Sequence, residues 1–201
     1  EIDKIISGKD TGIYDAMNKG IRASKGSVIS ILNSDDFYHY KSVISDVIKK
    51  FEKKNLMCVY GNLIYVSRYD INNVVRAWNS SSYKSDLFLY GWNPPHPTFF
   101  LRKECFNICG FYKTNIGNSA DIEFMHRLLE KKKLQSFYLN KILVTMRMGG
   151  SSNKSMISVI AQNVVIIKFL KINHNPYLVI RFVIYKIFNR ITQFFHAKLY
   201  K

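Results

Sequence analysis

The spacing of apolar residues along the chain changes repeatedly between the period of a strand and the period of a helix. Short apolar runs bounded by glycine, proline or polar residues predict strands, and we expect them at 2–6, 27–32, 57–66, 74–79, 98–101 and 139–146. Apolar residues at every third or fourth position predict helices, and we expect these at 13–23, 43–51, 103–109 and 120–132. Strands and helices that alternate in this way indicate an α/β fold.

The first three elements follow one another as strand, helix and strand, which predicts a parallel βαβ unit. Residues 8–12 form a turn-rich loop after the first strand, and Asp35 and Asp36 follow the second strand. In open sheets of this kind, ligands bind beyond the carboxyl ends of the strands. We therefore expect a ligand site that includes both segments.

The C-terminal part predicts two further helices, which the sequence NHNP at 173–176 separates after a GGSSNKS loop at 149–155. Apolar residues of the second helix form one stripe, and they are Ile180, Val183, Ile184, Ile187, Phe188, Ile191, Phe194 and Phe195. Basic residues interrupt this segment, so it does not resemble a transmembrane span of about 20 largely apolar residues. Two interpretations remain open: a basic amphipathic helix in a membrane surface, or a helix packed on the rest of the protein.

Charge is distributed unevenly over the 201 residues, whose formal net charge is +16. Residues 1–130 hold 17 Lys and Arg against 14 Asp and Glu, whereas residues 131–201 hold 13 Lys and Arg and no acidic residue. We therefore expect a domain at 1–150 and a basic helical extension at 151–201. The extension predicts an anionic partner, which is either nucleic acid or an anionic membrane surface.

Cysteines are few and odd in number, namely Cys58, Cys105 and Cys109. An odd count without a recognisable signal peptide predicts a reducing, cytosolic setting. Cys105 and Cys109 have the spacing of zinc ligands on a helix, but no second ligand pair accompanies them. We expect buried thiols in the core.

The adjacent carboxylates of Asp35 and Asp36 have two explanations. They can form a turn in which one carboxylate caps the next helix. They can also hold a divalent cation, because Mg²⁺ binds carboxylate oxygens and often completes its shell with substrate phosphates. The pair alone does not decide between these explanations.

A longer pattern surrounds this pair. The segment DTGIYDAMNKGIRASKGSVISILNSDD at 10–36 resembles the inverting glycosyltransferases of family 2, which have the GT-A fold. The residues that match in order are Asp10, Gly12, Tyr14, Asp15, Ala16, Asn18, Gly20 and Ala23. Segment 94–129 resembles the later half of the family, and MRMGGSSN at 146–153 resembles its Arg/Gly-Gly-Ser loop. The resemblance implies a Rossmann-like, nucleotide-sugar-binding mixed sheet flanked by helices.

The resemblance also implies roles for the acidic segment. Asp35 and Asp36 match the motif that holds Mn²⁺ or Mg²⁺ on the nucleotide diphosphate, without showing which of the two contacts the metal. Asn33 stands where many members carry another aspartate, and with Asp35 it is implied to bind the nucleotide sugar.

Four further positions receive roles in the same way. Asp10 and Gly12 match the loop that borders the nucleotide base, and His96 matches a loop histidine near the sugar or the acceptor. Asp121 matches the catalytic base of the family. An ordinary first-turn aspartate and a packed loop histidine are the structural alternatives for Asp121 and His96.

The resemblance is closest to members that build exopolysaccharide, colanic-acid-like polymer, capsule or O-antigen. It implies a UDP-, GDP- or dTDP-sugar donor, a saccharide or polyprenyl-diphosphate-linked acceptor, inversion, and a peripheral position on the cytoplasmic face of the membrane, without nucleic acid. Members begin with an extra strand, helix and strand before the segment matched by Glu1, so we expect N-terminal strands to be missing. The alternatives are a nucleotide-sugar-binding protein without catalysis and a basic nucleic-acid-binding domain.

Overall fold

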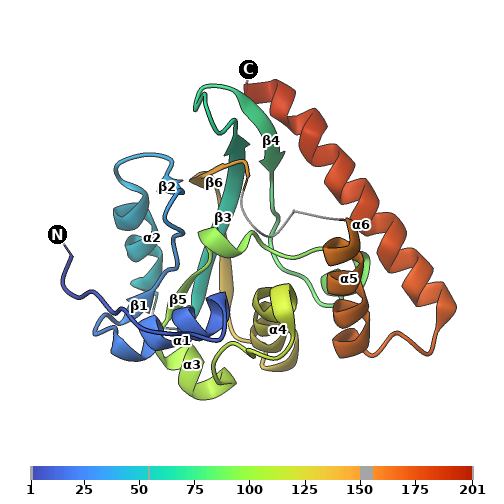
Figure 1. The fold of residues 1–201 in the computed structure, drawn as a ribbon, viewed down its shortest axis with the longest axis horizontal. Coiled ribbons are helices and arrows are strands. Elements are labelled where there is room, and N and C mark those ends of the chain that lie inside the picture. Colours follow the sequence, from blue (N-terminus) through green and yellow to red (C-terminus); the bar gives the residue numbers. More distant parts are fainter. Residues whose placement is uncertain (1, 54, 150–155, 201) are drawn as a thin grey trace.

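The structure, a computed structural model, describes residues 2–53, 55–149 and 156–200. It shows an α/β fold in which a six-stranded mixed sheet is flanked by helices (Figure 1). The strands are β1 (Val28–Ile29), β2 (Phe37–Tyr38), β3 (Cys58–Val66), β4 (Val74–Trp78), β5 (Phe100–Arg102) and β6 (Ser136–Arg147). The helices are α1 (Ile13–Ala23), α2 (Val43–Phe51), α3 (Glu104–Cys109), α4 (Ala120–His126), α5 (Met156–Leu170) and α6 (Pro176–Ala197).

Strand β3 is the centre of the sheet. It pairs in parallel with β6 and antiparallel with β4 and β5, while β1 pairs with β5 and β2 with β6, both antiparallel. All nine residues of β3 are buried. Because successive side chains of a strand point to opposite faces, Cys58 and Tyr60 contribute to one core and Val59 to the other.

The two cores lie on opposite faces of the sheet. Helix α2 covers one face, where Val43, Val47 and Phe51 pack against β3 and β6. Helices α1, α3 and α4 cover the other face, and α5 and α6 add Ile166 and Phe182 to that core. In α2 the apolar spacing therefore determines which side the helix turns to the sheet.

The expected α/β mixed sheet is confirmed, and α1 and α2 have the predicted bounds. The strand predicted at 2–6 is wrong, because this segment has no strand conformation and Ile2 and Ile5 are 79% and 81% exposed. A short apolar run becomes a stable strand only when another strand pairs with it, and no described residue pairs with this segment. The predicted βαβ unit is therefore not formed, and β1 pairs antiparallel with β5 instead. Residues 150–155 of the predicted loop lie outside the described residues.

Helix α6 packs along β4 and the 3₁₀ turn Leu87–Tyr90 (Figure 1). Phe182 is 1% exposed, and Lys186, Asn189 and Gln193 continue the inward-facing line toward the C-terminus. These positions are three or four residues apart and therefore share one side of the helix. The side of α6 that faces the protein is thus apolar at first and polar over its second half.

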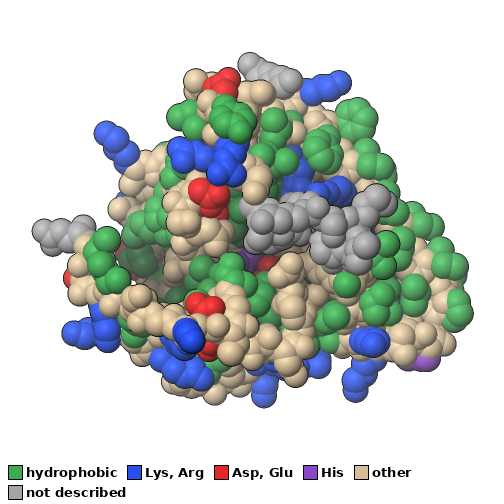
Figure 2. Space-filling model, viewed as in Figure 1, with side chains coloured by type: hydrophobic (Ala, Val, Ile, Leu, Met, Phe, Trp, Pro, Cys, Tyr) green, Lys and Arg blue, Asp and Glu red, His purple; other side chains and the backbone are tan. Residues whose placement is uncertain are grey.

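The apolar stripe predicted on α6 lies on its outer side. Ile184 and Phe188 are each 59% exposed, and Phe195 is 62% exposed. In Figure 2, hydrophobic side chains run along the right-hand edge of the molecule, where Figure 1 places α6. The helix does pack on the rest of the protein, but the predicted stripe is not the surface that packs.

Replacement of Gly91 by alanine tests how closely α6 approaches the 3₁₀ turn. Gly91 has a φ of 65°, and an added Cβ would lie 2.8 Å from the Lys186 Cβ. Backbone strain and overpacking of this kind each cost about 1–3 kcal/mol. Because both costs apply, we expect Gly91→Ala to lower the free energy of unfolding by about 2–6 kcal/mol in urea denaturation.

The matched control for this prediction is Gly20→Ala in α1. An added Cβ at Gly20 meets nothing within 4 Å, and alanine in a helix interior is favoured over glycine by roughly 0.5–1 kcal/mol. Gly20→Ala should therefore stabilise the protein or leave it unchanged. A Gly91→Ala variant as stable as the wild type would contradict the close packing of α6.

Candidate active site

Helix α4 is held in place by a buried acidic residue. Glu123 is 3% exposed, and its carboxylate forms ion pairs with Lys113 at 3.0 Å and with Arg127 at 2.8 Å. Arg127 also donates to the Phe111 carbonyl at 3.0 Å. These contacts fix the N-terminal turn of α4, which carries Asp121, relative to the loop after α3.

The half-buried Asp121 carboxylate is oriented by the backbone of its own turn. Its Oδ1 accepts a hydrogen bond from the Ile122 amide at 2.8 Å. Ser119 precedes the helix but makes no side-chain cap, because its hydroxyl donates to the Gln162 carbonyl of α5 at 3.2 Å. The Asp121 carboxylate is therefore held in one orientation at the start of α4.

Three side chains from other segments surround Asp121. His96 Nε2 and the Tyr112 hydroxyl are 2.9 Å apart, and the Tyr14 ring centre is 5.6 Å from that of Tyr112. Burial, and then the Asp121 carboxylate, raise the pKa of Tyr14 and the pKa of Tyr112. The structure therefore brings together two of the residues singled out in the sequence, Asp121 and His96.

The surroundings of the His96 imidazole favour its neutral form. Burial lowers the pKa of His96, and the nearby Asp121 carboxylate opposes this effect. A neutral imidazole has one donor and one acceptor nitrogen. His96 and Tyr112 can thus share a hydrogen bond and offer polar groups to a ligand.

Tyr112 belongs to this cluster although the sequence analysis gave it no role. Its backbone is tied to α1 by the buried Asn18, whose amide donates to the Tyr112 carbonyl at 2.9 Å and accepts from the Tyr112 amide at 3.1 Å. Asn18 and Tyr14 are both matched positions of the family pattern. The pattern therefore contained a signal for the cluster, since its helix brings Tyr14 to the loop that carries Tyr112.

The Asp10–Gly12 loop is exposed and shaped by its own carboxylates. Asp10 Oδ1 accepts from the Gly12 amide at 3.0 Å, and Asp15 Oδ2 accepts from the Thr11 amide at 3.0 Å. Within the described ranges, no hydrogen bond joins Asp10 or Gly12 to Asp121. The loop begins α1 and is connected to the cluster through Tyr14, in the first turn of that helix.

The acidic pair lies between β1 and β2, and its two carboxylates have different surroundings. Asp35 is exposed, whereas Asp36 is 8% exposed. The Asn33 amide group donates to Asp36 Oδ2 at 2.7 Å, while Asp36 Oδ1 is buried and has no hydrogen-bond partner among the described residues. Burial raises the pKa of Asp36, Asn33 lowers it, and Asp35 raises it again.

These surroundings fit a divalent cation. A buried carboxylate oxygen without a partner is costly, and a cation held with Asp35 would compensate it. In the part of the chain that the structure describes, no group of three or more His, Cys, Asp or Glu is placed to hold a metal. Further ligands would therefore come from substrate phosphates and water, as is usual for Mg²⁺.

Cys105 and Cys109 are free and buried, as expected for core thiols.

The chain belongs to Glycosyl transferase family 2. The profile of this family matches residues 2–117, which is more than half of the chain. The family assignment made from the sequence is therefore confirmed, and the arrangement of the sheet and its flanking helices is that of a GT-A-like glycosyltransferase fold.

The chain is also similar to curated proteins and to a solved structure. The chain is 27% identical over 157 residues to the proteins named "PGL/p-HBAD biosynthesis glycosyltransferase" of Mycobacterium bovis (strain BCG / Pasteur 1173P2) and Mycobacterium tuberculosis (strain ATCC 25177 / H37Ra). These matches cover 75% of this chain and 58% of the relatives. The crystal structure of Staphylococcus aureus TarS 1–349 in complex with UDP aligns with a TM-score of 0.50 and 13% identity, over 86% of this chain and 51% of TarS.

Proposed function

We propose that the full-length protein transfers a sugar from a nucleotide-sugar donor to a saccharide or lipid-linked acceptor with inversion at the anomeric carbon. The observation that carries this proposal is the Asp121 carboxylate at the start of α4, grouped with His96, Tyr14 and Tyr112 in a chain of this family. The names of the curated relatives and the UDP of the TarS complex support a nucleotide-sugar donor.

Asp121 acts as the general base in this proposal. As the acceptor hydroxyl attacks, its oxygen forms a bond to the anomeric carbon, and its proton passes to the Asp121 carboxylate. The bond between the anomeric carbon and the diphosphate oxygen breaks, and the diphosphate leaves with the electron pair. A positioned base of this kind contributes roughly 10²–10⁴-fold in rate. Attack on the face opposite the leaving group inverts the anomeric centre.

Asp35 and Asp36 would hold Mg²⁺ or Mn²⁺ in this proposal, and Asn33 would orient Asp36 through the hydrogen bond described above. The ion, when bound, supplies positive charge at the leaving diphosphate. Asp10 and Gly12 would border the nucleotide base. A full-length preparation incubated with UDP-, GDP- and dTDP-sugars and a saccharide acceptor, followed by analysis of product and anomeric configuration, tests the proposal. Retention of configuration, or no product from any donor, would argue against it.

The proposed biological setting is bacterial surface polysaccharide synthesis at the cytoplasmic face of the membrane. None of the described helices is long and apolar enough to cross a bilayer. We propose that the outer stripe of α6 lies in an anionic membrane surface instead. Support comes from the exposure of Ile184, Phe188 and Phe195, since an apolar face flanked by basic residues is typical of interfacial helices.

Vesicle flotation tests this membrane contact. The double variant Phe188→Ser and Phe195→Ser should weaken binding to anionic vesicles by at least about 100-fold, because each fully buried aromatic side chain contributes about 1.5–3 kcal/mol. The bound fraction should also fall with added salt, which screens charges over about 8–10 Å at physiological ionic strength.

The matched control is Tyr69→Ser, which removes an aromatic side chain that is 94% exposed in the loop between β3 and β4. Its bound fraction should equal that of the wild type. A wild-type protein that stays off anionic vesicles at low salt would contradict the contact. Binding to RNA without binding to vesicles would favour the nucleic-acid alternative.

A further inference from the structure

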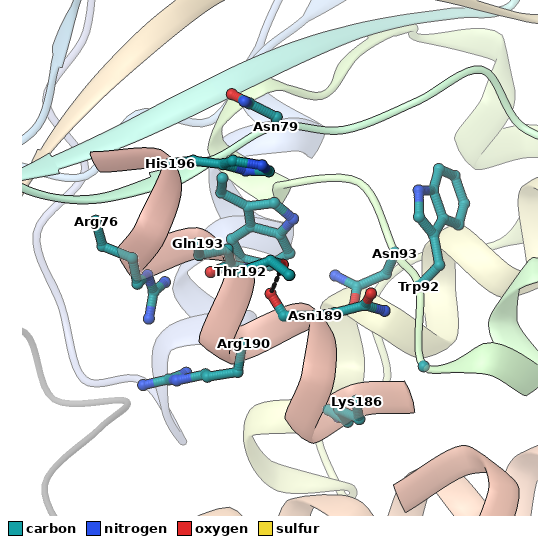
Figure 3. A pocket seen from close by; sticks show the side chains of 12 residues that line it. Arg76, Asn79, Trp92, Asn93, Lys186, Asn189, Arg190, Thr192, Gln193 and His196 are labelled. Carbon is teal, nitrogen blue, oxygen red and sulfur yellow. Dashed lines mark hydrogen bonds between the residues drawn. The ribbon is translucent and has the colours of Figure 1, made fainter. Parts of the chain in front are cut away.

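A pocket between β4 and α6 gathers positive charge. Its volume is about 140 Å³, and its lining includes Arg76 of β4 with Lys186, Arg190 and His196 of α6. Figure 3 shows the guanidinium groups of Arg76 and Arg190 on the same side of α6. No acidic residue is among the described residues that line the pocket.

Arg76 is buried although it carries a charge. It is 2% exposed, its guanidinium carbon lies 3.6 Å from the centre of the Tyr65 ring, and its Nε has no hydrogen-bond partner among the described residues. Burial of an arginine without an anion is costly. The cation–π contact with Tyr65 offsets only part of that cost, since such contacts contribute about 0.5–2 kcal/mol.

The neighbouring cations add to this cost. Burial lowers the pKa of Lys186, Asp121 raises it and Arg190 lowers it, and together these effects bring it to about 8. The ion pairs formed within the described ranges include neither Arg76, Lys186 nor Arg190. Several like charges held together without a counter-charge define a site that an anion would stabilise.

The sheet and a loop connect the pocket to both parts of the candidate active site. Arg76 stacks on Tyr65 of β3, and β6 separates β3 from β2, which begins directly after Asp36. Asn93 of the pocket lining lies three residues before His96 of the Asp121 cluster. An anion in the pocket would therefore sit near both the acidic pair and the base of the proposed transfer.

The size of the pocket and the outer side of α6 indicate which anion fits. A volume of about 140 Å³ is below the roughly 300–1,000 Å³ of sites that enclose a whole small molecule, so the pocket suits a phosphate group rather than a nucleotide. Arg190 lines the pocket and is itself exposed, and Ile191 of the outer apolar stripe is its neighbour in the chain. Helix α6 thus places cationic side chains in the pocket and apolar side chains on its solvent-facing side.

We propose that this pocket binds the phosphate group of a lipid-phosphate acceptor, whose apolar part lies along the outer stripe of α6. The proposal rests on the proposed function and deepens it, since it assigns the acceptor to a class and to residues. Arg76, Lys186 and Arg190 hold the phosphate, and the acceptor hydroxyl is thereby kept near Asp121.

Tryptophan fluorescence of the full-length protein provides the measurement. Trp78 and Trp92, the two tryptophans of this chain, both line the pocket. Dodecyl phosphate, dodecanol and inorganic phosphate are titrated separately, and the dodecyl phosphate titration is repeated with saturating UDP and Mg²⁺. Arg190→Gln and Lys186→Gln remove pocket cations, and Lys198→Gln removes a cation next to α6 that does not line the pocket. Circular dichroism checks that each variant is folded.

Dodecyl phosphate should bind at least about tenfold more tightly than inorganic phosphate or dodecanol, because only it carries both the charge and the chain. Arg190→Gln and Lys186→Gln should each weaken it by roughly tenfold or more, whereas Lys198→Gln should not. The proposal would be overturned if dodecanol bound as tightly as dodecyl phosphate, or if both folded pocket variants bound dodecyl phosphate as tightly as the wild type. Competition of UDP and Mg²⁺ with dodecyl phosphate would also overturn it, because the pocket would then belong to the donor. If dodecyl phosphate binds as expected but the full-length protein transfers no sugar, the result counts against the proposed function and not against the phosphate site.

Discussion

Replacement of Asp121 by asparagine is expected to reduce sugar transfer by at least about 10²-fold while donor affinity stays nearly unchanged. Asparagine keeps the shape of the side chain and can still accept the hydrogen bond from the Ile122 amide, but its amide cannot take a proton from the acceptor. The loss should therefore appear in the turnover number rather than in donor binding. The measurement is steady-state transfer by the full-length protein together with donor titration.

The control for this prediction is Asp3→Asn, which removes an exposed carboxylate from the N-terminal segment and should leave turnover unchanged. His96→Gln separates base catalysis from positioning, because it alters a hydrogen-bond partner of Tyr112 without removing the base. Weaker donor binding with unchanged turnover of the bound donor in Asp121→Asn would show that Asp121 is not the base.

Removal of divalent cations by EDTA is expected to abolish transfer, and added Mg²⁺ or Mn²⁺ should restore it. The double variant Asp35→Asn and Asp36→Asn should be inactive at any concentration of either cation, because an amide oxygen lacks the charge that attracts a hard cation. Donor binding in the presence of Mg²⁺ should be lost in parallel. Undiminished transfer in EDTA would remove the metal from the proposed mechanism.

The single variant Asp36→Asn distinguishes a cation site from a structural turn. The raised pKa of Asp36 means that the folded state holds this proton more tightly than the unfolded chain does. The ionised carboxylate therefore costs stability once the pH exceeds its unfolded pKa, and the cost is fully present above the folded pKa. Asp36→Asn should leave the free energy of unfolding near pH 7 unchanged or raise it while transfer is lost. A clear loss of stability together with normal activity would favour the structural turn.

Local sequence features predicted much of the fold because they report interactions between near neighbours. The helical spacing of Ile13, Met17 and Ile21 and that of α2 predicted these helices with the observed bounds. The prediction of a strand at 2–6 was wrong because a strand depends on residues that are distant in the chain. Its apolar pattern was correct, but strand formation depends on a partner from elsewhere in the chain, and the described residues supply none.

In the candidate site, too, some residues were predicted from the sequence and others were found only in the structure. The family pattern pointed to Asp121 and His96, which the structure places in one cluster, and to the acidic pair beyond β1. It did not point to Tyr112, because that residue reaches the cluster through hydrogen bonds between its backbone and Asn18, 94 positions away in the chain. The roles of all these residues stay predictions until the variants above are measured.

The sequence by itself determined the family and the α/β class, because ordered motifs and apolar periods are properties of neighbouring residues. Only the tertiary structure decided which side of α6 faces the protein. An apolar stripe alone predicts burial of that stripe, yet Lys186, Asn189 and Gln193 face β4 while Ile184 and Phe188 face outward. The orientation follows from what the partner surface offers: Gly91 allows close approach of the helix, Arg76 stacks on Tyr65, and the Asn189 amide donates to the Tyr90 carbonyl at 3.3 Å. The contacts between Gly91 and Lys186 and between Asn189 and Tyr90 join segments about 100 positions apart, and no local pattern records them.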